Sequence, residues 1–293
     1  IITNTFTETL RQPIFGIIVG ATILLFIFSP SLVMFTMEDD NLLLQDVGLS
    51  TLLVAGLLLA VFSAAGTVTE EIENKTVLTV VSKTVRRSTF IIGKFLGIAA
   101  AVLLGMYLLS LSLLFVVRQG VMQAAYNKAD FVVIILGSIT LGIILIVAAF
   151  ANYLYGLRFS STFVVLASIL ATILAAVLFF IDKDWHYNPQ PQNLNFQMVG
   201  PLLLTVVAVL LLTAVAVAAA TRLNMITTLL VCTIFFLLGT SLPFWLGPVI
   251  ARGGVWQYVG QAALAIVPNV NHYVVTNAIY AKAPVPMSYI GLT

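Results

Sequence analysis

Charged side chains gather in one short part of this sequence, between Thr69 and Gly97, where two long apolar stretches are separated. The segment holds eight of the chain's 24 charged residues (13 basic and 11 acidic), namely Glu70, Glu71, Glu73, Lys75, Lys83, Arg86, Arg87 and Lys94. The acids come first and a basic cluster follows, so the carboxylates can face a soluble partner. The basic side chains can contact anionic lipid headgroups, at about 1 kcal/mol each. This chemistry is electrostatic docking, and it predicts a short amphipathic helix on the membrane surface.

Residue types that carry catalysis or hold metals do not occur at useful spacing in the chain. His186 and His272 are 86 positions apart, and no cysteine or paired carboxylate stands at ligand spacing from either. The Gly93-Lys94 pair lacks the upstream glycine and the following Ser or Thr of a nucleotide-binding G-x-x-x-x-G-K-S/T loop. Cys232, the only cysteine, lies in an apolar run, where a small packed residue is expected. We predict no catalytic residue, metal, cofactor or nucleic-acid partner for this chain.

The composition indicates whether water or lipid surrounds the chain. Hydrophobic residues make up 61% of the chain and charged residues 8%, whereas a soluble domain carries roughly 25% charged residues. The mean hydropathy is +1.12, so there is too little polar surface to cover a water-soluble globule. The apolar runs are continuous rather than alternating, which favours helices over a barrel. We predict an all-α, polytopic membrane helix bundle that forms a single transmembrane domain over 1–293.

Seven apolar stretches reach the roughly 20 residues that cross about 30 Å of hydrocarbon. They run approximately over 14–36, 46–67, 89–117, 131–156, 161–181, 199–221 and 225–247. Before the first stretch, Phe6 and Leu10 lie four positions apart, which predicts an interfacial amphipathic helix. The segment 247–293 is polar and rich in aromatic residues. Because such residues favour the headgroup region, we expect one more span beyond the C-terminus.

Small residues recur at helical spacing in two of these stretches. Gly93, Gly97, Ala101 and Gly105 follow one another every four positions in the third stretch, and Gly16 and Gly20 do so in the first. Such a ridge lets another helix approach closely. Two interpretations remain open for the third stretch: packing within the chain, or a helix that slides or contacts a second protomer.

The distribution of Lys and Arg predicts the orientation, because these residues favour cytoplasmic segments. With a cytoplasmic N-terminus, eight Lys and Arg residues fall inside and five outside, and the net charges are 8 − 4 = +4 and 5 − 7 = −2. This predicts a cytoplasmic loop over 68–88 and an extracytoplasmic loop over 182–198. No charged residue lies deep inside a span, which argues against an ion relay. Asn152 is the most polar exception, and we interpret it as a hydrogen bond between helices.

The run over 70–97, EEIENKTVLTVVSKTVRRSTFIIGKFLG, resembles the loop of type-2 ABC exporter permeases. That family's pattern is an acidic start, a Thr, a short apolar run, Ser-x-Pro-Val, an Arg, and a Gly-Lys pair opening the next span. Thr84 departs from the pattern, which has Pro at that position, and the AIVPNVNHY run with Pro268 is similar to the stretch before the family's last span. The matching positions are Glu71, Glu73, Thr76, Leu78, Ser82, Val85, Arg87, Gly93 and Lys94.

The resemblance implies a permease subunit that is not itself an enzyme, in the inner (cytoplasmic) membrane. Its loop 68–88 would be the coupling helix that docks into a separate cytoplasmic ABC ATPase. The coupling residues would be Glu70, Glu71, Glu73 and Thr76, and the membrane-surface anchors would be Lys83, Arg86, Arg87 and Lys94. The expected partners are that ATPase, a second permease in a homodimer or heterodimer, and membrane lipid. The alternatives are a non-transporting structural or assembly subunit of a larger membrane complex, and an ion-independent secondary transporter.

Overall fold

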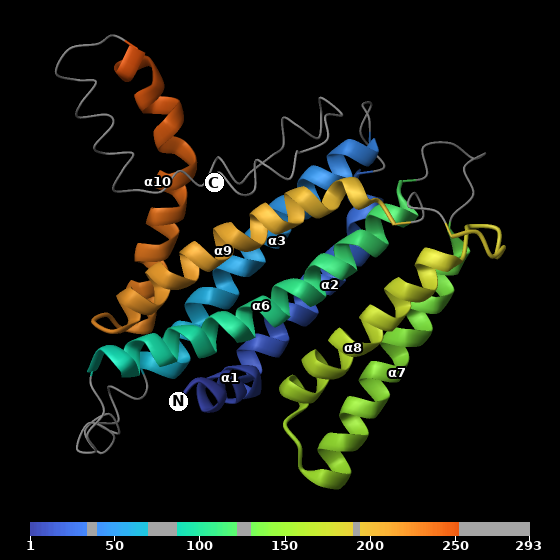
Figure 1. The fold of residues 1–293 in the computed structure, drawn as a ribbon, viewed down its shortest axis with the longest axis horizontal. Helices are drawn as coiled ribbons and strands as arrows, with labels where there is room; N and C mark the ends of the chain where they lie inside the picture. The colour runs from blue at the N-terminus through green and yellow to red at the C-terminus, as the bar shows by residue number, and fades with distance from the viewer. Residues whose placement is uncertain (34–39, 70–86, 122–129, 190–193, 252–293) are drawn as a thin grey trace.

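A computed structural model describes residues 1–33, 40–69, 87–121, 130–189 and 194–251. The regular structure of these residues is helical (Figure 1), apart from one isolated bridge between Ile181 and Tyr187. The prediction of an all-α, polytopic helix bundle is confirmed. The elements are α1 (Ile2–Arg11), α2 (Pro13–Val33), α3 (Asp40–Ala64), the π-helical turn η1 (Ala65–Thr69), α6 (Arg87–Gln119), α7 (Phe131–Tyr155), α8 (Phe159–Phe180), the 3₁₀ turn η3 (Phe196–Met198), α9 (Val199–Ala220) and α10 (Met225–Ala251).

Six helices in the described part of the chain are long and apolar enough to cross a membrane. They are α2, α3 continued into η1, α6, α7, α8, and α9 preceded by η3. The seventh predicted stretch coincides with α10. The apolar part of α10, Met225–Ser241, is shorter than the six spans. The predicted stretches 131–156 and 161–181 end within two residues of the bounds of α7 and α8. Continuous apolar runs therefore located the spans well.

Local chemistry explains where the helices begin and end. Pro13 begins α2, where its missing N–H has no partner to lose. It also restricts Gln12 to an extended conformation (φ −65°, ψ 128°), which ends α1. Asp130 caps α7 by accepting a hydrogen bond from the Val133 N–H at 3.2 Å. Gly156 ends the same helix with φ 63°, a left-handed conformation that glycine adopts without strain.

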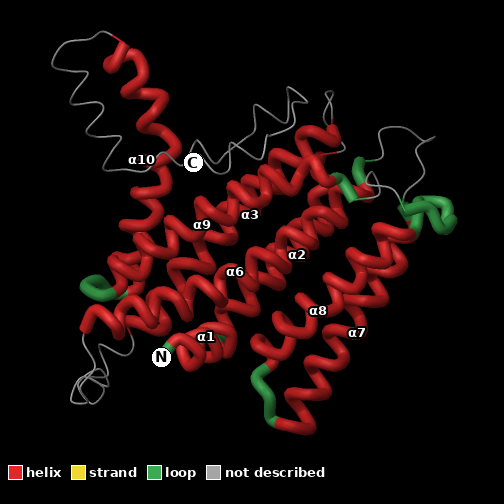
Figure 2. The backbone as a smooth tube through the Cα atoms, in the orientation of Figure 1, coloured by secondary structure: helices red, strands yellow, loops and turns green. Residues whose placement is uncertain are grey.

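Successive spans alternate in direction, so the bundle has two ends (Figures 1 and 2). The α1 end carries α1, η1, the start of α6, the turn between α7 and α8, and the turn between α9 and α10. The far end carries the C-terminal ends of α2, α6 and α8. α7 and α8 pack against each other as an antiparallel hairpin, whereas α10 packs against α9 and α3 in its first half and then projects away from the bundle.

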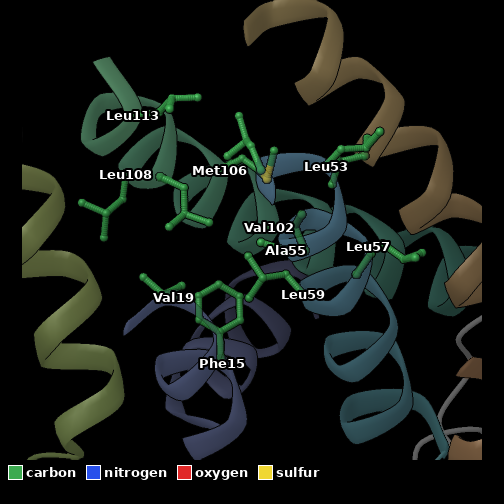
Figure 3. Packing of buried hydrophobic residues seen from close by; sticks show 14 of the residues in the cluster. Phe15, Val19, Leu53, Ala55, Leu57, Leu59, Val102, Met106, Leu108 and Leu113 are labelled. Atoms are coloured by element: carbon green, nitrogen blue, oxygen red, sulfur yellow. The ribbon is translucent and has the colours of Figure 1, made fainter. Parts of the chain in front are cut away.

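Helix α3 occupies the centre of the bundle. It packs against α2, α6 and α9. In its most apolar stretch of 18 residues, 67% of the residues are buried, compared with 22% in the corresponding stretch of α7. Phe15, Leu59 and Met106 lie in the interior (Figure 3), where each is at most 2% exposed. A Cβ atom added at Gly56 of α3 would collide with Val209 of α9. Because lipid tails are as apolar as this core, close packing at small residues stabilises the bundle more than burial does.

Candidate functional site at the α1 end

The segment predicted to couple to a soluble partner falls between two described elements. Its residues Glu70, Glu71, Glu73 and Thr76, and the predicted anchors Lys83 and Arg86, lie outside the described residues. The segment joins η1 to α6, and Arg87 is the first residue of α6. Helix α1 contacts both of these elements. The described part of the site is therefore α1 together with the helix ends on which it packs.

Helix α1 is the amphipathic helix that the sequence predicted before the first span. Thr5, Thr9 and Leu10 are buried on one face, whereas Thr3 and Asn4 are exposed. The Thr9 hydroxyl donates a hydrogen bond to the Thr5 carbonyl oxygen at 2.8 Å, so this polar side chain is satisfied within α1. The buried face lies mainly on α6, with further contacts to α8 and η1. Helix α1 thus covers the start of α6, the part of that helix that directly follows the charged segment.

Lys94 is placed under α1 and not at an open membrane surface. Its side chain is 4% exposed, and its Nζ atom lies 3.4 Å from Oε2 of Glu8. The sequence predicted a surface anchor at Lys94, without the cover that α1 provides. Because Glu8 is 39% exposed, water screens the pair, and its contribution to stability is about 0.2–1 kcal/mol. The ion pair orients α1 on α6.

The first half of the small-residue ridge on α6 is the surface that receives α1. A Cβ atom added at Gly93 would lie 2.8 Å from Cγ2 of Ile1. One added at Gly97 would lie 2.7 Å from Cβ of Thr5 and 2.8 Å from the carbonyl oxygen of Ile2. Real Cβ atoms do not approach other atoms this closely. The absence of a side chain at these two positions is what lets α1 lie flat against α6.

The second half of the ridge faces α2 and α3. Ala101 is fully buried. A Cβ atom added at Gly105 would lie 3.0 Å from Cζ of Phe15 and 3.2 Å from Cδ1 of Leu59. Of the two interpretations of the ridge, the described contacts are those of packing within the chain.

Gly97→Leu is expected to lift α1 from α6, because the new side chain would occupy the place of Thr5. Overpacking costs about 1–3 kcal/mol, equivalent to a roughly 5- to 150-fold larger population of lifted α1. The measurement is the rate of maleimide modification of Thr5→Cys in a Cys232→Ala background, since Thr5 is fully buried in the intact bundle. Gly20→Leu is the matched control, because a Cβ atom at Gly20 meets nothing within 4 Å. Equal, slow modification in the two variants would contradict this packing.

Ser160 ties the start of α8 to the junction of α1 and α2. Its hydroxyl lies 3.0 Å from the carbonyl oxygens of Leu10 and Gln12, to which it donates. The Leu10 carbonyl stands at the end of α1, where the last carbonyl groups have no N–H partner within the helix, and the Gln12 carbonyl also accepts from the Phe15 N–H at 3.2 Å. Gly16 of α2 leaves the necessary room, because a Cβ atom there would lie 2.6 Å from Oγ of Ser160. Sequence reasoning missed this contact between residues about 150 positions apart, although the glycine spacing of the first span was a signal of it.

A second polar centre lies at the far end of the bundle, and sequence reasoning missed it as well. Nε of Arg118 lies 3.0 Å from Oδ2 of Asp130, and their side chains are 3% and 0% exposed. The same guanidinium donates to the carbonyl oxygen of Ile181 at 2.8 Å and to that of Leu178. The other carboxylate oxygen of Asp130 accepts from the Val133 N–H. The ends of α6, α7 and α8 are thereby joined by one buried, hydrogen-bonded ion pair.

Two further predicted features are resolved at the helix ends. Nδ2 of Asn152 donates to the carbonyl oxygen of Leu157 at 2.7 Å, within the turn that follows its own helix. The prediction that Asn152 bonds another helix is therefore wrong. The predicted loop 182–198 begins with a tight turn, in which the Asp182 N–H donates to the His186 carbonyl oxygen at 3.0 Å. In the described parts of the chain, no group of three His, Cys, Asp or Glu residues is placed to hold a metal ion.

No family model, curated protein or solved structure in the comparisons matches this chain.

Proposed function

We propose that the chain is the transmembrane permease subunit of an ATP-driven ABC exporter. A separate cytoplasmic ATPase would hydrolyse ATP, and this subunit would convert the hydrolysis into export or mechanical work. The observation that carries the proposal is the acidic-then-basic segment over 70–87, which joins the central helix α3 to α6. Its resemblance to the coupling loop of type-2 permeases and the six apolar spans support the same assignment.

The charges near the helix ends support a cytoplasmic position for the α1 end, in an inner (cytoplasmic) membrane. At this end the described residues include Glu8 and the basic residues Arg11, Arg87, Lys94, Arg158 and Arg222. At the far end they include two basic residues, Arg118 and Lys183, and the acidic residues Asp40, Asp46, Asp130, Asp182 and Asp184. Basic residues favour the cytoplasmic side, so the α1 end faces the cytoplasm in this proposal.

The orientation is tested by labelling single cysteines in a Cys232→Ala background. Lys183→Cys lies in the exposed far-end turn, and Lys83→Cys lies in the charged segment. A membrane-impermeant maleimide added to intact cells is expected to modify Lys183→Cys only, and the same reagent is expected to modify Lys83→Cys after the cells are opened. Modification of Lys183→Cys exclusively from the cytoplasmic side would contradict the orientation.

The contacts at the α1 end could transmit a movement of the charged segment to several helices. The charged segment is attached to η1 and α6, so a push on it acts on the central helix α3 and on α6 together. Glu8 and the ridge at Gly97 hold α1 on α6, and Ser160 holds α8 on the end of α1. Displacement of α6 would therefore carry α1 and the start of α8 with it. This arrangement suits a rigid-body transition between two states of the bundle.

The positions of charged residues favour this mechanism over an ion-coupled transporter. Proton and ion relays require ionisable groups within the spans. In the described spans, acidic and basic residues stay near the helix ends, and α7, α8 and α9 contain none. The energy source is then external to the chain, as in an ATP-driven assembly with a second permease in a homodimer or heterodimer.

The assignment is tested by purifying the tagged chain from its native membrane in a mild detergent. The expected preparation contains a second protein with a G-x-x-x-x-G-K-S/T loop and hydrolyses MgATP, and native mass spectrometry gives two permeases and two ATPases. An assembly without nucleotide hydrolysis would contradict the proposal and would favour a structural or assembly subunit.

A further inference from the structure

A cavity of about 300 Å³ lies between α2, α6, α7 and α8, inside the membrane-spanning part of the bundle. Its walls include Phe26 of α2, Phe115 of α6, Leu141 of α7 and Phe163 of α8, and none of the described residues that line it is charged. The volume is at the lower end of the ~300–1,000 Å³ that is usual for ligand sites. The proposed coupling mechanism makes no use of this cavity.

The polar groups of the cavity are confined to the part nearer the far end. Gln119 is the last residue of α6, and Ser112 lies seven residues before it, about 10 Å deeper at 1.5 Å per residue. Ser138 and Thr140 lie at a comparable depth in α7. Beyond them, toward the α1 end, the lining is apolar as far as Phe163. The polar groups of the cavity thus lie among apolar side chains in its far-end half, and one of them, Gln119, stands at the end of α6.

The cavity reaches the surface that faces lipid. Ile27 of α2 and Ser138 of α7 both line it, and both are exposed. Helix α7 packs chiefly against α8, so helix packing does not close the side between α2 and α7. A molecule dissolved in the bilayer can therefore enter between these two helices without passing through water.

Hydrocarbon is the occupant that fits this lining. The part of the cavity toward the α1 end has an apolar lining, and apolar cavities in proteins stay free of water. Nearer the far end, the Ser112 hydroxyl already donates to the Leu108 carbonyl oxygen at 2.9 Å. About 300 Å³ corresponds to about ten water volumes of ~30 Å³, which is room for a comparable number of methylene groups. We propose that the cavity binds one acyl chain of a bilayer phospholipid, with its glycerol ester region at the Gln119 end. This site does not depend on the proposed ATP-driven function.

Two glycines of α7 provide a matched pair of variants. Gly137 lines the cavity and Gly142 does not, and a Cβ atom at either position meets nothing within 4 Å. Gly137→Phe would fill the cavity without a clash at Cβ, whereas Gly142→Phe makes the same chemical change on the same helix outside it. Comparison of the two separates occupation of the cavity from the general effect of a bulky residue in α7.

The experiment uses the full chain in phosphatidylcholine vesicles that contain a phosphatidylcholine with a diazirine at the end of one acyl chain. After illumination, mass spectrometry compares labelling of Phe26, which is 1% exposed and lines the cavity, with labelling of Phe28, which is 61% exposed. We expect label on both residues in the wild type and in Gly142→Phe. We expect at least a tenfold loss at Phe26 alone in Gly137→Phe.

Two results would overturn the proposal. One is a wild-type protein labelled at Phe28 but not at Phe26, which would mean that acyl chains contact only the outer surface. This result needs no variant, so it stands even if Gly137→Phe fails to fold. The other is unchanged labelling of Phe26 in Gly137→Phe with the helical content of the wild type, which would mean that the label reaches Phe26 by another route.

Discussion

Asp130→Asn is expected to destabilise the folded chain by about 3–5 kcal/mol, the cost of leaving one partner of a buried ion pair uncompensated. The substitution keeps the size of the side chain and can still cap α7 at Val133. It removes the negative charge from beside Arg118, whose side chain is only 3% exposed. The guanidinium then keeps its bonds to the carbonyl groups at the end of α8 but loses the carboxylate charge beside it. Thermal unfolding in detergent, followed by far-ultraviolet circular dichroism, measures the loss.

The matched control is Asp184→Asn, which removes an exposed carboxylate at the same end of the bundle. Its expected effect lies within about 0.5 kcal/mol, as is usual for surface positions. Arg118→Leu alone should be about as harmful as Asp130→Asn, and the double variant no worse than the more harmful single variant, because it leaves no uncompensated charge. A free energy of unfolding for Asp130→Asn equal to that of the control would show that the pair is dispensable.

The triple variant Glu70→Lys, Glu71→Lys and Glu73→Lys is expected to lose its ATPase partner while still inserting into the membrane. Three exposed charge pairs at about 0.2–1 kcal/mol each give 0.6–3 kcal/mol, or about 3- to 150-fold in affinity before repulsion is added. Insertion should survive, because no span changes and added positive charge favours the cytoplasmic side. The measurement is the amount of ATPase that co-purifies with the tagged chain.

The matched control is the triple Glu→Asp variant at the same positions, which retains all three charges. It is expected to bind the ATPase within about threefold of the wild type. Equal binding by the Glu→Lys and Glu→Asp variants would show that the acidic residues are not part of the contact. Loss of binding in both variants would indicate that the contact with the ATPase depends on the length of these side chains and not on their charge alone.

The sequence was sufficient to predict the class of fold and the spans, because long, continuous apolar runs can cross a membrane only as helices, whose backbone bonds are all local. It also located α1 and the ridge on α6, since both follow from spacing within one helix. The spacing of Gly97 from Gly93 and Ala101, for example, is enough to predict the ridge. Both features depend on residues that are close together in the chain, so the spacing of apolar and small residues is enough to predict them.

The polar contacts could not be predicted because their partners are distant in sequence. Arg118 bonds to carbonyl groups at the end of α8, 60 and 63 positions away, and Lys94 pairs with Glu8, 86 positions away. The prediction of orientation from the Lys and Arg residues assumes that each charged residue lies at the surface, independent of the others. Only the packing of α1, α7 and α8 against α6 shows that each is enclosed. The cavity between the four helices has the same origin, since its lining comes from four separate stretches.

The most direct measurement of the central claim is ATP turnover by the partner ATPase in phospholipid vesicles, with and without this chain. The account predicts that turnover depends on the wild-type chain, falls to the level of the ATPase alone with the triple Glu→Lys variant, and is retained with the triple Glu→Asp variant. Turnover that is the same with no chain, with the wild type and with Glu→Lys would contradict the assignment of a coupling permease.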